Sequence, residues 1–182
     1  MNKYLASVFA GIMLSAASVG GVYAIAPSNI VTPEIVTSAG PMSFEMFCMI
    51  NPRECQPGGA SKISLTEEAL RTMERVNARV NRSIRPKLDS AALQVWKINP
   101  GSGDCKSYAV SKRHELMRAG FPSSALRIAY VKTRAGQGHA VLVVKTNQGD
   151  LTLDNLTSEI VNFRQAGYRV VAMSGANPKR WS

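Results

Sequence analysis

Between residues 64 and 86, apolar side chains recur every three or four positions. These residues are Leu70, Met73, Val76, Val80 and Ile84. The spacing predicts the buried face of an amphipathic helix. Ser64-Leu65-Thr66-Glu67 precedes the stripe and has the form of a capping box, in which the Ser64 hydroxyl accepts from the Glu67 amide. We therefore expect a helix that starts after Ser64 and ends near Arg85-Pro86.

The pattern then changes from helices to strands. A second helix is predicted over Asp104–Met117, with Gly120 as its C-terminal cap, and a short helix over residues 88–98. Beyond Pro122, runs rich in Val, Ile, Leu and Tyr alternate with glycine turns. The runs are Leu126–Thr133, His139–Thr146, Leu151–Asp154 and Tyr168–Ser174. This order predicts an α+β fold, with N-terminal helices packed on a C-terminal antiparallel sheet.

Residues 1–24 have the pattern of a signal peptide. Lys3 precedes an uncharged, mostly apolar run over Leu5–Val19, and Val22-Tyr23-Ala24 predicts cleavage after Ala24. An uncleaved membrane anchor is the alternative, although a span requires ~20 strongly apolar residues. Cleavage leaves 182 − 24 = 158 residues, and we expect no stable membrane insertion after it.

Residues 25–60 lack periodicity and are rich in Pro, Gly and Ser, so we expect an extended arm there and a folded domain over 61–182. Within the arm, Cys48 and Cys55 flank the turn dipeptide Asn51-Pro52. In an oxidising compartment we expect them to form a disulfide loop; two unpaired buried thiols are the alternative. Cys105 is then the odd cysteine.

The charge balance is strongly basic, with 22 Lys and Arg against 12 Asp and Glu. Cleavage of the leader removes one lysine and leaves 21 − 12 = +9. Several arginines share one face of the first predicted helix: Arg71, Arg75, Arg79 and Arg82. No aromatic residues interleave with them, so a solvated face is favoured over a nucleic-acid surface. The expected partner is a protein or peptide, including an acidic envelope or surface protein, and no nucleic acid.

Three residues have the types and positions that thiol catalysis needs. Cys105 starts a helix directly after Gly101-Ser102-Gly103-Asp104, where free backbone amides and the helix dipole favour the thiolate. His139 begins a strand 34 residues later, and Asp154 ends the next strand. A nucleophile, a base and a carboxylate that orients the base are the requirements of acyl transfer. A buried structural cysteine, a turn histidine and a surface aspartate are the alternative.

The hairpin between the two strands decides whether His139 and Asp154 can meet. A four-residue turn at 145–148 places His139 opposite Asp154. A tight Gln148-Gly149 turn pairs Asp154 with Val143 and separates the two residues by roughly 13 Å along the sheet. A catalytic triad therefore requires the wider turn or a bulge.

The segments GDCKSYAVSKRHELMRAGF, GHAVLVV, LTLDNLT and YRVVAMSGANPKRW resemble the bacterial transglutaminase-like cysteine peptidases, as do VNARVNRSI and VWKINPGSGDC upstream. The resemblance covers roughly residues 75–181. It implies a papain- and transglutaminase-like fold, with Cys105 as nucleophile, His139 as base and Asp154 as the orienting acid.

One departure from the family concerns calcium. Family members typically read Gly-Asp-Cys-Glu-Asp, and in the members that release surface adhesins the acids beside the cysteine bind calcium. This chain keeps Asp104 but has Lys106 and Ser107 in place of the two acids. Calcium takes six to eight oxygen ligands, which a lysine ammonium opposes. The sequence therefore predicts no cofactor and no required metal.

Together these features predict an exported, periplasmic cysteine peptidase that hydrolyses a protein or peptide by a Cys-His-Asp mechanism. Two alternatives stay open. One is an acyltransferase or amidase that acts on cell-envelope peptides, and the other is an inactive binding module of the same fold.

Overall fold

The computed structural model describes residues 38–89 and 94–182, which lie within one compact unit that spans Ile35–Ser182. The predicted leader, its cleavage point and residues 25–37 lie outside the described residues. None of the helices in the described part of the chain is long and apolar enough to cross a membrane.

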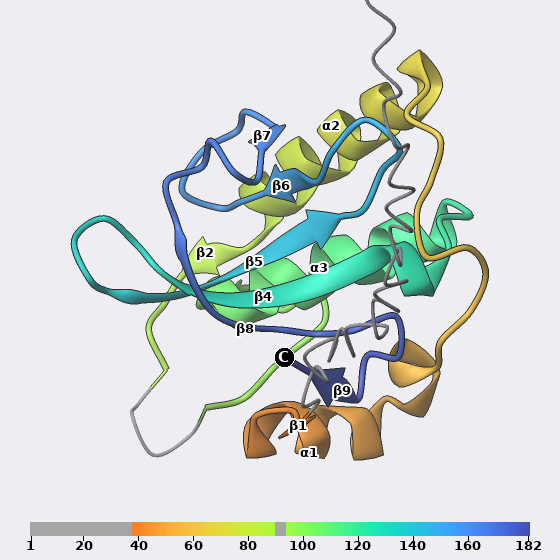
Figure 1. Cartoon of the computed structure of the whole chain (residues 1–182). Coiled ribbons are helices and arrows are strands. Elements are labelled where there is room, and N and C mark those ends of the chain that lie inside the picture. The colour runs from red at the N-terminus through yellow and green to blue at the C-terminus, as the bar shows by residue number, and fades with distance from the viewer. Residues whose placement is uncertain (1–37, 90–93) are drawn as a thin grey trace, which may run out of the picture. The chain divides into compact units, whose positions relative to one another are not determined.

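A five-stranded sheet in the order β7-β6-β5-β4-β8 forms the centre of the fold (Figure 1), and every neighbouring pair is antiparallel. Its strands are β4 (Leu126–Lys132), β5 (Gly138–Val144), β6 (Leu151–Leu153), β7 (Val161–Asn162) and β8 (Arg169–Met173). Four of the five correspond to the predicted apolar runs. The predicted α+β fold with an antiparallel sheet is therefore confirmed.

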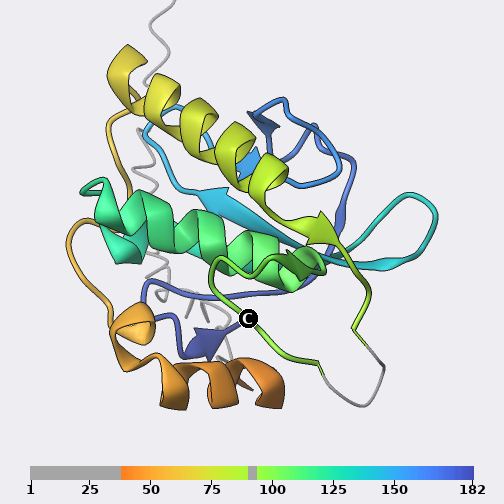
Figure 2. The ribbon, with the colours of Figure 1, turned by 180° about the vertical axis from the view of Figure 1, so that it is seen from behind.

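Two helices cover one face of this sheet, α2 (Glu67–Ser83) and α3 (Cys105–Arg118), as the view from behind shows (Figure 2). Strand β5 is buried on both sides. Ala140, Leu142 and Val144 belong to the core shared with the helices, whereas Val141 and Val143 pack with Tyr168 and its neighbours on the other face. Burial on both faces explains why β5 is a nearly continuous apolar run.

Helix α2 begins two residues later than the capping box predicts. Thr66, not Ser64, is the N-cap, and its hydroxyl accepts from the Ala69 amide at 3.1 Å. Ser64 is not available because its neighbours Ile63 and Leu65 bond to the β5–β6 connection. The predicted apolar stripe does face the core, with Met73, Val76 and Val80 buried.

The extended conformation expected within residues 25–60 is wrong for Met42–Ile50, which form helix α1, followed by the 3₁₀ turn η1 (Pro52–Cys55). Phe44 and Phe47 anchor α1 in the core. The predicted disulfide between Cys48 and Cys55 is present and joins α1 to η1. The boundary of the folded domain at residue 61 stays a prediction.

The remaining elements are short. They are β1 (Ser38–Ala39), which pairs with β9 (Arg180–Trp181); β2 (Arg85–Pro86), which pairs with β3 (Ser102–Gly103); and the 3₁₀ turn η2 (Ser123–Ala125). The helix predicted over 88–98 is absent from its described part, residues 88–89 and 94–98. Asp89 there accepts a hydrogen bond from the amide of Val95 at 3.3 Å.

Candidate active site

Cys105 is the first residue of α3 and is partly exposed, with a free thiol. Asp104 caps this helix, because its Oδ1 accepts from the Lys106 amide at 3.1 Å. Gly103 lies tightly against the first turn of the helix. A Cβ at that position would lie 2.8 Å from the Ser107 side chain, so a glycine lets the chain enter α3 closely enough to present the thiol.

His139 and Asp154 lie side by side and are both buried, with 2.8 Å between Nε2 of His139 and Oδ1 of Asp154. Neither of the two predicted turns occurs. Val144 pairs with Leu151, so residues 145–150 form the connection. Continuing this register would place residue 156 opposite His139, which makes Asp154 a diagonal neighbour. Diagonal side chains of this length can still meet across a sheet.

The connection over residues 145–150 is held by residues from outside the hairpin. Ile63 donates its amide to the Lys145 carbonyl at 3.0 Å and accepts from the Asn147 amide at 3.0 Å. The Leu65 amide donates to Oδ1 of Asn147 at 2.9 Å. The segment before α2 therefore fixes the register that brings His139 to Asp154.

The structure places the three predicted site residues in one line, Cys105–His139–Asp154. Cys105 and His139 line the same cleft, and His139 contacts Asp154 on its other side. Because Nε2 faces Asp154, the other ring nitrogen, Nδ1, is the one available to the thiol. The second histidine of the chain, His114, bonds instead to Glu54, with 2.6 Å between Nδ1 and Oε1, and takes no part in this line.

The surroundings of His139 favour its charged form. Burial lowers the pKa of His139, but hydrogen bonds with Asp154 and Cys105 and the negative charges of both outweigh burial and raise the pKa to about 9. Burial would raise the pKa of Asp154, but hydrogen bonds from His139 and Tyr168 hold it below its usual value. At neutral pH the site can therefore hold an imidazolium beside the Asp154 carboxylate.

Tyr168 is a site residue that sequence reasoning did not find. Its hydroxyl donates to Oδ2 of Asp154, and its ring centroid lies 5.8 Å from that of His139. The Leu156 amide donates to Oδ1 of Asp154 at 3.1 Å. Tyr168 and Leu156 therefore orient the carboxylate that orients the imidazole. Tyr168 directly precedes β8, an edge strand of the sheet that is not adjacent to β6. No local pattern in the sequence therefore links Tyr168 to Asp154.

Replacing Tyr168 with Phe removes one donor from Asp154 and keeps the ring. We expect the pKa of Asp154 to rise, because the lost hydrogen bond favoured the carboxylate. The acid limb of the pH profile for iodoacetamide alkylation of Cys105 should move to higher pH, and the rate at neutral pH should fall roughly tenfold. Tyr130→Phe is the control, since Tyr130 makes no hydrogen bond to His139 or Asp154 among the described residues. Equal profiles for the two variants would contradict this role of Tyr168.

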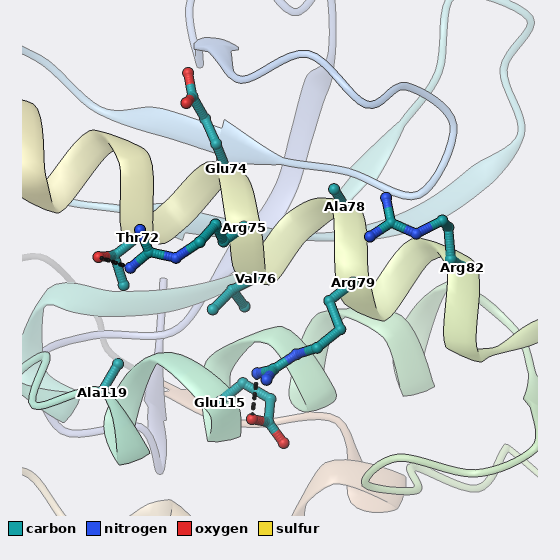
Figure 3. Close-up of a pocket in the computed structure, with 9 residues that line it drawn as sticks. All are labelled: Thr72, Glu74, Arg75, Val76, Ala78, Arg79, Arg82, Glu115 and Ala119. Atoms are coloured by element: carbon teal, nitrogen blue, oxygen red, sulfur yellow. Dashed lines mark hydrogen bonds and ion pairs between the residues drawn. The ribbon is translucent and has the colours of Figure 1, made fainter.

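A cleft of about 330 Å³ opens over the thiol. Its lining includes Cys105 and His139 together with Lys87, Leu88 and Leu156. A larger groove of about 650 Å³ lies between α2 and α3 and contains no residue of the triad. Figure 3 shows Arg79 in this groove reaching Glu115, at 2.6 Å, and Arg75 beside Thr72. We therefore assign chemistry to the smaller cleft.

A cysteine at the start of a helix that packs on an antiparallel sheet, with a histidine and an aspartate on neighbouring strands, defines the papain- and transglutaminase-like class. The sequence matches the bacterial transglutaminase-like cysteine proteinase model over residues 34–182. The chain belongs to this family.

Solved structures of Legionella pneumophila LapG are similar to the chain. One has 28% identity and a TM-score of 0.53, and the match covers 59% of this chain and 66% of LapG. A calcium-bound form has 28% identity and a TM-score of 0.53, and the match covers 59% of this chain and 65% of LapG. An EGTA-treated form has 28% identity and a TM-score of 0.51, and the match covers 57% of this chain and 62% of LapG. The chain thus spans slightly less than two thirds of LapG. No match is found among the curated proteins.

Proposed function

We propose that this chain is an exported cysteine peptidase that hydrolyses a protein or peptide in the bacterial envelope. One observation carries the proposal, the placement of Cys105 and His139 in one open cleft, with His139 held by Asp154 behind it. The family and the similarity to LapG support it. Export and a periplasmic location rest on the leader pattern in residues 1–24.

The proposed reaction has two steps. The Cys105 thiolate attacks the peptide carbonyl carbon and forms the carbon–sulfur bond, and the imidazolium of His139 gives its proton to the departing amine as the carbon–nitrogen bond breaks. Water then attacks the thioester carbon while His139 takes one proton from it, and the carbon–sulfur bond breaks to release the acid product and the Cys105 sulfur. The proton stays on the ring beside the thiolate or returns to sulfur. The backbone amide of Cys105 is the candidate donor to the oxyanion at the start of α3, because the amides of Lys106 and Ser107 already donate to Asp104.

The test compares bacteria that carry the wild-type chain with bacteria that carry Cys105→Ala. Proteomics of the envelope should find new protein termini only in the wild type. Mass spectrometry of the products separates hydrolysis from the alternative, an acyltransferase or amidase on envelope peptides, because transfer leaves the acyl group on a second amine. Identical termini in both strains would favour an inactive binding module.

Calcium binding in the manner of the calcium-bound LapG structure does not fit the residues beside Cys105. The ammonium of Lys106 already contacts the Asp104 carboxylate, and the neighbouring Ser107 supplies no charge. Among residues 38–89 and 94–182, no three His, Cys, Asp or Glu side chains gather as a ligand set. We propose that the reaction needs no calcium.

Activity should therefore be the same in EGTA and in added Ca²⁺. A cation beside Asp104 would meet the ammonium within a few ångströms, and the repulsion is about 4 kcal/mol for two unit charges at 4 Å and an effective dielectric constant of ~20. Calorimetry with Ca²⁺ and turnover in chelator measure the two consequences. Micromolar binding, or activity that EGTA abolishes and Ca²⁺ restores, would show that the lysine is accommodated.

A further inference from the structure

A buried ion cluster lies directly beside the proposed nucleophile. The side chain of Lys106 is only 6% exposed, and its ammonium contacts the Asp104 carboxylate. The same ammonium lies 3.9 Å from Oδ2 of Asp89, whose side chain is 20% exposed. Asp104 and Asp89 thus share one internal cation in a poorly hydrated place, where unpaired charges are strongly disfavoured.

The two carboxylates belong to different parts of the site. Asp104 caps α3, which carries Cys105. Asp89 follows directly after Lys87 and Leu88, two residues that line the cleft over the thiol. Asp89 also accepts from the amide of Val95 at 3.3 Å. The lysine therefore joins the nucleophile's helix to one wall of the cleft.

Backbone pairing ties the same wall only at its beginning. Arg85 donates to Gly101 at 3.1 Å, and Lys87 donates to Gly103 at 2.9 Å. Beyond Lys87, the contacts of the Lys106 ammonium with Asp89 and Asp104 connect the wall to α3 in the described part of the chain. Removing the ammonium would leave two partly desolvated carboxylates facing each other, which repel and push the wall outward.

We infer that Lys106 is a positioning residue whose ammonium acts as a built-in cation. It holds the cleft wall 86–89 against the start of α3 and keeps Asp104 in its capping position, so that the site is assembled without a bound ion. The inference rests on the proposed function in that Cys105 is taken as the nucleophile.

The test uses three variants of the whole chain. Lys106→Ala removes the ammonium and leaves space between the carboxylates, and alanine keeps the helix propensity of the position. Lys106→Met removes only the charge and fills the space. Lys62→Ala is the matched control, because Lys62 is exposed. Circular dichroism checks that each variant is folded, and Asp89→Asn, which leaves the cap of α3 intact, replaces Lys106→Ala if that variant does not fold.

The first measurement is hydrogen–deuterium exchange, which needs no substrate. In Lys106→Ala and Lys106→Met, the backbone amides of residues 85–89 should exchange at least ~10-fold faster than in the wild type. The amides of β4 and β5 should be unchanged, because only the ion pairs of Lys106 are lost. Wild-type protection of this segment in both variants would overturn the inference. This readout is independent of peptidase activity. The inference about Lys106 can therefore be wrong while the proposed function is right, and the proposed function can be wrong while the inference is right.

The second measurement is rescue. In chelator, iodoacetamide should alkylate Cys105 roughly tenfold more slowly in Lys106→Ala than in the wild type. Ethylammonium or Ca²⁺ should restore the rate, since either cation can enter the space and bind both carboxylates, whereas tetramethylammonium has no N–H to donate and should not. Lys106→Met should be slow and unresponsive, and Lys62→Ala should be unaffected. An unchanged rate in Lys106→Ala, or equal rescue by tetramethylammonium, would overturn the inference.

Discussion

Replacing Cys105 with Ala is expected to abolish peptide hydrolysis, with a fall of at least ~10³-fold in kcat. No other residue of the chain can take over the attack. The sequence has three cysteines, and Cys48 and Cys55 are joined to each other. Under non-reducing conditions iodoacetamide therefore reports on the Cys105 thiol alone, and the variant should show no labelling.

The same probe tests the partnership with His139. The wild-type thiol should react at pH 6–7, and the rate should fall in His139→Ala, because the imidazolium that stabilises the thiolate is lost. Cys105→Ser serves as a second inactive variant that keeps a polar side chain. Full hydrolysis by either Cys105 variant, or unchanged labelling in His139→Ala, would contradict the assignment of the nucleophile and its base.

Asp154→Asn is expected to lower kcat by about 10²- to 10⁴-fold while the fold stays intact. The substitution keeps the shape of the side chain and removes its charge. The pKa of His139, raised to about 9 by its two partners, should fall toward its ordinary ~6.5. The active form carries an imidazolium, which is lost as the pH rises through the pKa of His139. The alkaline limb of the activity profile should therefore move to lower pH.

Asp150→Asn is the matched control for this prediction. Asp150 lies in the β5–β6 connection, before β6 rather than after it, and it pairs with Lys145, outside the triad. The control changes the net charge by the same amount and should leave the alkaline limb in place. If Asp154→Asn and Asp150→Asn gave the same profile, the carboxylate of Asp154 would not set the charge of His139.

The sequence was sufficient for the elements whose pattern is local. Helix α3 and strands β4 and β5 follow from periodicity, since each has a cap, a glycine or an apolar run of its own. Helix α1 was missed because it is apolar nearly all round. Phe44 and Phe47 are buried, while Met42 and Met49 on the same short helix are exposed, so no contrast between faces signals a helix.

The site was predictable in composition but not in geometry. Cys105, His139 and Asp154 could be named from their positions at a helix start and at strand ends. The register that joins them depends on Ile63 and Leu65, roughly 80 positions earlier in the chain. Tyr168 reaches Asp154 through the tertiary fold in the same way. Contacts of this range leave no trace in a window of neighbouring residues.

The packing of Phe44 against Trp181 has a consequence for the order in which the chain matures. The two ring centroids are 5.2 Å apart, yet 181 − 44 = 137 residues separate them in sequence. At ~5–20 residues per second, synthesis of this stretch takes roughly 7–27 s. The Cys48–Cys55 bond spans seven residues and needs no later part of the chain, so it can close as soon as both cysteines reach an oxidising compartment. We expect α1 to be crosslinked early and to dock last, so a chain stopped after Pro178 should keep its sheet while protease cuts at α1.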